Sequence, residues 1–115
     1  MKDEDFAGRT KQFVLRIIRL YRELSKSVEA QVIGKQILRS GTSIGANYRE
    51  ARRAHSKPDF LNKISICIKE ADESLYWIEL LVESGIVKNE SLEALRDEND
   101  QIIAILVSMS KKSKQ

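Results

Sequence analysis

Residues 39–54 read RSGTSIGANYREARRA, and their flanks have the apolar spacing of a helix. Glycine costs about 1 kcal/mol relative to alanine inside a helix, and Ser, Thr and Asn are also poor helix formers. Gly41 and Gly45 lie one turn apart, so one side of such a helix is open to close approach by another backbone. Ser43 and Asn47 follow on an adjacent line, where they need polar partners. We interpret the stretch as a helix that gives up local stability for close packing and a polar network.

A glycine-rich loop is the alternative for this stretch. The sequence has no G-x-x-x-x-G-K-[ST] pattern, which a phosphate-binding loop would require. Residues 48–54 also continue the helical spacing smoothly. These two observations favour the helix.

Apolar residues recur at three- and four-residue spacing in four segments, which predicts four helices. Their expected bounds are about 3–24, 29–54, 57–84 and 90–110, followed by a basic tail over 111–115. Ser56 and Pro58 have the pattern of a helix start, and Gly85 suits the position after a helix end. No sustained period-2 alternation indicates a strand. The sequence therefore predicts an all-α, antiparallel up-down four-helix bundle in a single domain, 1–115.

The third and fourth segments have more apolar surface than one bundle core needs. Glu70, Glu73 and Trp77 lie on a second line beside the core stripe, and residues 102–107 (IIAILV) are apolar almost all round. A helix of this kind is buried by more than one neighbour, so we expect a homo-oligomer. The alternative is a wide core stripe with one exposed tryptophan. The residues expected at helix-packing or subunit contacts are Gly41, Ser43, Gly45, Asn47, Glu50, Glu70, Glu73 and Trp77.

Charge is unevenly distributed along the chain. Residues 1–58 contain 13 Lys/Arg and 6 Asp/Glu, whereas residues 59–115 contain 7 and 11. A basic half can bind nucleic acid, or it can meet the acidic half of a neighbouring subunit. Arginine forks suit phosphate oxygens, and such contacts are independent of base sequence. The candidate residues for binding RNA or DNA are Arg16, Arg19, Arg22, Lys35, Arg39, Arg49, Arg52, Arg53 and Lys57.

Ion pairing between helices is the alternative use of these cations. Arg39 could pair with Glu70 or Glu73, in which case its role is structural. If most of the arginines are paired in this way, the protein is a structural ring that binds another protein. Both readings stay open at the level of the sequence.

Arg49 and His55 are the only pair that indicates an enzyme. Their spacing near a helix end resembles the motif of the HEPN helical ribonucleases. There a histidine could move a proton at a ribose hydroxyl, and an arginine could stabilise the charge on phosphorus. Such a pair arises easily in a basic helix, so we assign no catalytic residue and expect a non-enzymatic protein.

Metal, disulfide and membrane chemistry are not expected. Cys67 is the only cysteine and His55 the only histidine, so neither an internal disulfide nor a Cys/His zinc site can form. Glu70 and Glu73 have no histidine partner on their helix, which a di-metal bundle would need. No signal-peptide pattern and no apolar run of about 18 residues is present. We expect a cytoplasmic protein with no cofactor and no membrane partner.

The stretch 37–86 resembles the bacterial four-helix-bundle proteins associated with the 23S rRNA intervening sequence. The resemblance rests on RSGTSIGANYREARRA and on SKPDFLNKISICIKEADESLYWIELL, which begins at Ser56. The matching residues are Arg39, Ser40, Ser43, Ile44, Asn47, Glu50, Ala51, Arg53, Ala54, Ser56, Lys57, Asp59, Phe60, Lys69, Glu70, Ala71, Glu73, Tyr76, Trp77, Leu80 and Leu81.

The resemblance implies an antiparallel four-helix bundle that assembles into a barrel-like homopentamer, with no established enzyme activity. A related branch is the accessory variability protein of diversity-generating retroelements, whose basic pentamers bind nucleic acid and a reverse transcriptase. The present chain departs from that branch because its second half is acidic. The implied partners are therefore further copies of the chain, RNA or DNA, and a protein partner.

Overall fold

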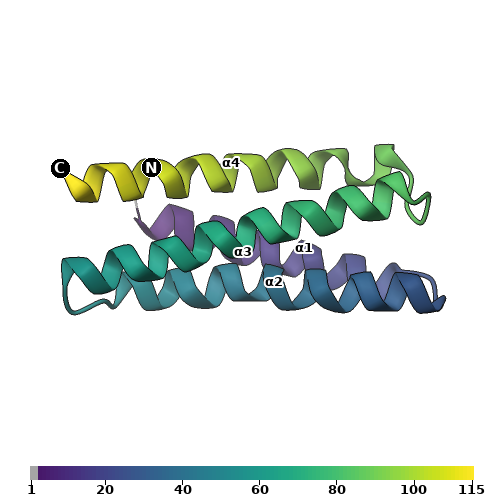
Figure 1. Ribbon diagram of the computed structural model, residues 1–115, viewed down its shortest axis with the longest axis horizontal. Helices are drawn as coiled ribbons and strands as arrows, with labels where there is room; N and C mark the ends of the chain where they lie inside the picture. The colour runs from purple at the N-terminus through teal and green to yellow at the C-terminus, as the bar shows by residue number, and fades with distance from the viewer. Residues whose placement is uncertain (1–2) are drawn as a thin grey trace.

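The computed structural model describes the backbone of residues 3–115 and the side chains of residues 5–115. Four helices account for nearly all of this range. They are α1 (Asp3–Glu23), α2 (Val28–Arg52), α3 (Lys57–Glu83) and α4 (Asn89–Lys114). Consecutive helices run in opposite directions along a body of 45 × 21 × 19 Å (Figure 1). The predicted all-α four-helix bundle is confirmed, and residues 3–115 contain no strand.

The connections between the helices follow local sequence signals. The Ser27 hydroxyl accepts the Ala30 N–H at 3.3 Å to begin α2, and the Ser56 hydroxyl accepts the Asp59 N–H at 3.2 Å to begin α3. Such caps satisfy backbone donors that have no partner within the helix. Gly85 ends α3 with a φ of +80°, which favours glycine over other residues.

The fourth helix is longer than the sequence pattern indicated. Residues 111–114, expected to form a basic tail after a helix end near 110, continue α4 to Lys114. Their lysines stand in the last helical turn, where positive charge offsets the partial negative charge of the terminal carbonyls. The apolar pattern ends before this basic segment, so it could not show that the helix continues to Lys114.

Residues 39–52 are helical throughout, and the glycines of α2 lie against α1. A β-carbon at Gly41 would lie 3.0 Å from Ile17 Cγ2, and one at Gly45 would lie 3.1 Å from Val14 Cγ2. Ile17 of α1 thus fills the space that Gly41 leaves, and Val14 of α1 approaches Gly45. Their poor helix propensity is offset by this packing, which a larger side chain would prevent.

Small polar residues form the opposite seam, between α2 and α3. The hydroxyl oxygens of Ser40 and Ser74 lie 2.8 Å apart and are fully buried. The Cys67 thiol donates to the Ile44 carbonyl at 3.6 Å, and burial raises the pKa of this thiol to about 12. Cys67 is therefore an inert core residue, because the reactive thiolate is strongly disfavoured.

The bundle core contains one buried amide. Asn99 of α4 is fully buried, and its Nδ2 donates to the Ala71 carbonyl of α3 at 2.9 Å. A buried polar side chain with a specific partner fixes the register of the two helices.

Within the described residues, no helix has an apolar stretch long enough to cross a membrane.

We expect Gly41→Leu to lower the free energy of unfolding by about 1–3 kcal/mol, since the new side chain would be forced against Ile17. Gly8→Leu is the matched control, because no atom lies within 4 Å of a β-carbon there. It should raise stability by about 0.5–1 kcal/mol through helix propensity. Urea unfolding followed by circular dichroism measures both. Equal effects of the two substitutions would contradict the packing role of Gly41.

Candidate nucleic-acid interface

The antiparallel topology gathers cations at one end of the bundle. The α2–α3 connection and the end of α4 lie together at the left of Figure 1. The Lys57 ammonium of α3 donates to the Gln115 carbonyl at 3.4 Å, which places these segments in contact. We call this surface the basic end. It comprises Arg49, Arg52 and Arg53 at the end of α2, Lys57 at the start of α3, and Lys111, Lys112 and Lys114 in the last turn of α4.

The positive charge of the basic end is only partly compensated by described carboxylates. Glu50 forms an ion pair with Lys63 at 2.9 Å, and this contact raises the pKa of the lysine. Asp59 stands in the first turn of α3, where it complements the helix dipole. Among the side chains of residues 5–115, Arg52 and Arg53 have no ion pair or hydrogen bond. The basic end therefore presents exposed guanidinium and ammonium groups to solvent.

The α4 lysines were not among the residues predicted from the sequence. The sequence analysis assigned positive charge to the first half of the chain, and Lys111, Lys112 and Lys114 belong to the acidic second half. Their basic run is visible in the sequence, but its position at the same end of the bundle as the C-terminus of α2 depends on the fold. Antiparallel packing places the C-terminal ends of α2 and α4 at the same end of the bundle, with the start of α3 in contact with the end of α4.

Other predicted cations lie away from the basic end. Arg19 and Arg22 are exposed toward the opposite end of α1, with Arg16 partly buried near the start of α4. Lys35 is exposed on the first half of α2. Among the cations predicted from the sequence, only Arg49, Arg52, Arg53 and Lys57 therefore lie at the basic end.

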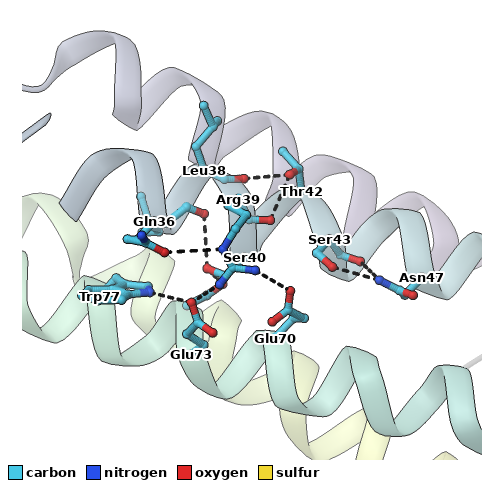
Figure 2. Close-up of polar contacts among 12 residues, drawn as sticks. Gln36, Leu38, Arg39, Ser40, Thr42, Ser43, Asn47, Glu70, Glu73 and Trp77 are labelled. Carbon is cyan, nitrogen blue, oxygen red and sulfur yellow. Dashed lines mark hydrogen bonds and ion pairs between the residues drawn. The ribbon is translucent and has the colours of Figure 1, made fainter. Parts of the chain in front are cut away.

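Arg39 is held in a network between α2 and α3 (Figure 2). Its Nη1 donates to Glu70 Oε2 at 3.0 Å, and its Nη2 contacts Glu73 Oε2. Trp77 Nε1 donates to the same Glu73 oxygen at 3.0 Å. The tryptophan hydrogen bond and the arginine lower the pKa of Glu73. This is the ion pairing that the sequence analysis considered for Arg39, and it joins the two helices at the bundle surface.

The remaining polar residues of the opening stretch have local partners. Asn47 Nδ2 donates to both the Ser43 carbonyl and the Ser43 hydroxyl at 2.9 Å, all within α2 (Figure 2). Thr42 likewise donates to the Leu38 carbonyl at 2.7 Å. The expected polar network therefore divides into contacts within α2 and contacts to α3, the latter made by Arg39, Ser40 and Glu50.

Arg49 and His55 line the same groove between α1 and α2. Among the described side chains, these two form no hydrogen bond with each other. A second, smaller groove lies between the end of α1 and the start of α4. No group of three or more His, Cys, Asp or Glu residues within the described part of the chain could hold a metal ion. The guanidinium and ammonium groups of the basic end are suited to binding anions such as phosphate.

A family model described as "23S rRNA-intervening sequence protein" matches residues 2–108. A crystal structure of a protein of unknown function from the S23 ribosomal protein family, from Bacteroides thetaiotaomicron VPI-5482, is 43% identical with a TM-score of 0.90. That match covers 96% of this chain and 99% of the other. The comparison with curated proteins gives no match.

We expect Arg39→Met to lower the free energy of unfolding at neutral pH by about 1–2 kcal/mol. The substitution leaves Glu70, which is 8% exposed, without its charged partner, while solvent partly screens the loss. Lys35→Met, at an exposed position of the same helix, is the control and should change stability by less than about 0.5 kcal/mol. Urea unfolding provides the comparison, and equal stability of the two variants would show that the network is not structural.

Proposed function

Because the chain belongs to the 23S rRNA-intervening sequence protein family, we propose that it is a non-enzymatic protein that binds RNA through its basic end. The observation that carries the proposal is the gathering of cations from three helices at one end of the bundle. Phosphate contacts supply most of the affinity of such surfaces and do not select a base sequence. A scaffolding role follows if the bound RNA also meets a protein partner.

Geometry supports the basic end over the cations of α1 as the contact surface. Lys57 and the lysines of α4 extend the arginines of α2 across three adjacent segments, so successive phosphates can be contacted together. Arg19 and Arg22, by contrast, belong to one helix at the other end. Arg39 is engaged by two carboxylates, and releasing it for RNA would cost those ion pairs.

We further propose that the protein acts as a homo-oligomer. Large apolar side chains remain exposed on the single chain, among them Val32 at 57% and Tyr76 at 53%. A subunit contact would remove such side chains from water. The number five and the ring shape come from the family resemblance described above. A ring would repeat the basic end around its axis, which raises effective affinity without better individual contacts.

Two alternatives remain distinct from RNA binding. A purely protein-interaction ring would use the exposed apolar residues and leave the basic end paired with carboxylates of other copies.

A ribonuclease acting through Arg49 and His55 is favoured by one observation, that both line one groove. Intact RNA after prolonged incubation with the protein, and no change on His55→Ala, would dispose of the ribonuclease.

Reversing two charges at the basic end should abolish most RNA binding. We expect Lys57→Glu combined with Lys112→Glu to weaken binding of a labelled oligouridylate by at least about tenfold at low salt. The slope of log K against log salt should also fall by about 1–2 between roughly 50 and 200 mM. Fluorescence anisotropy measures both quantities.

Arg19→Glu combined with Arg22→Glu is the matched control, since it changes the net charge equally at exposed positions of α1. This variant should retain most of the affinity. Equal losses in the two double variants would show that RNA responds only to net charge. Loss in the α1 variant alone would move the contact surface to α1.

Light scattering after size exclusion should give a mass of several 13.2 kDa subunits for the purified protein. We expect Val32→Glu combined with Tyr76→Glu to reduce that mass, because both positions are exposed in the single chain and a buried carboxylate would oppose association. Circular dichroism should show unchanged helix content in the variant. A wild-type protein that elutes as a monomer would contradict the homo-oligomer.

A further inference from the structure

A groove of about 620 Å³ lies at the basic end, between the first half of α1 and the second half of α2. This volume falls within the range of about 300–1,000 Å³ that is typical of small-ligand sites. Ala7 and Val14 contribute from α1, and Gly45 and Ala46 contribute from α2. We call these four small or apolar residues the floor of the groove.

Small side chains on α2 explain why the groove is present. Gly45 has no side chain, and Ala46 has only a methyl group, where α2 runs beside α1. Val14 already lies close to Gly45, with its Cγ2 only 3.1 Å from the position of a β-carbon, so the two helices are in contact at the base of the groove. The opening is therefore a feature of the packed bundle and needs no movement of the helices.

Cations stand along the rim of the same groove. Arg49 lies in the last turn of α2 and Arg53 is the residue that caps this helix, and both line the groove. Neither has an ion pair among the described side chains. Two carboxylates also line the groove, but Glu50 is paired with Lys63, and Asp59 lies at the start of α3. An anionic group would therefore be directed to the α2 rim.

Hydroxyl groups complete the lining. Thr10 donates its hydrogen to the Ala7 carbonyl at 2.9 Å, and Thr42 donates to the Leu38 carbonyl at 2.7 Å. Thr10 is only 2% exposed, whereas Thr42 is partly exposed and its hydroxyl oxygen keeps a lone pair that can accept a hydrogen bond. A ligand that donates, such as a base with an exocyclic amino group, matches this acceptor.

We propose that the groove binds one nucleoside monophosphate unit of single-stranded RNA, with the base on the floor and the phosphate against Arg49 and Arg53. This inference rests on the proposed RNA-binding function and names the unit that is recognised. An apolar floor beside a cationic rim fits a base joined to a phosphate, whereas a free phosphate would leave the floor unused. A duplex would keep its bases stacked and inaccessible to the groove.

Isothermal titration with AMP tests the groove separately from the rest of the basic end. Ala46→Trp places an indole in the groove from an exposed position and leaves every charge unchanged. We expect it to weaken AMP binding by at least about tenfold, and Arg49→Gln to do the same through loss of a phosphate contact. Ala94→Trp adds the same bulk at an exposed position of α4 outside the groove and should bind AMP like the wild type.

Adenosine and inorganic phosphate are titrated in parallel, and each should bind more weakly than AMP because it engages only one part of the groove. Unchanged AMP affinity in Ala46→Trp would overturn the inference. So would a wild-type protein that binds oligouridylate in a salt-dependent manner but does not bind millimolar AMP, and this outcome would leave the proposed function standing. AMP binding without any RNA binding would overturn the proposed function and the assignment of the nucleotide to RNA.

Discussion

The structure depends on the close packing of α2 against two neighbours at once. On one side, Gly41 receives Ile17 of α1, and on the other side, Ser40 forms a buried hydrogen bond with Ser74 of α3. Adjacent residues of one helix thus meet two different helices, which is possible only because both side chains are small. Large residues here would separate the helices and lose the dispersion contacts of the core. The poor helix formers in the middle of α2 are the consequence of this constraint.

The same packing fixes the antiparallel arrangement, which in turn determines the electrostatics of the molecule. Along the chain, charge divides into a basic half and an acidic half. In space, positive charge also gathers at one end of the bundle, because the lysines in the last turn of α4 and the arginines in the last turn of α2 lie at that same end. Cations near helix C-termini are stabilising in their own right. The C-termini of α2 and α4 lie at the same end of the bundle, so the cations that stabilise each helix end together make that end basic.

Individual cations divide between structure and surface according to their neighbours. Arg39 begins the stretch 39–54, yet its guanidinium is engaged by Glu70 and Glu73, and Trp77 adds a further donor to the network. Arg53 has no such partner among the described side chains. The difference arises because α3 offers carboxylates opposite Arg39, whereas Arg53 lies just after the end of α2, where the chain turns toward Ser56.

The sequence by itself determined the four helices, their approximate bounds and their packing faces. Apolar spacing, the serine caps and the glycine after α3 are local signals, and each acts within a few residues. The sequence also indicated Arg39 as a partner of Glu70 or Glu73, because their helices had to pack together. Only the tertiary structure decided that Arg19 and Arg22 lie apart from Arg53, that the lysines of α4 join the basic end, and that a groove opens beside Gly45. These features depend on which helix ends meet and which side chains fill the space between helices, and no local pattern specifies such long-range contacts.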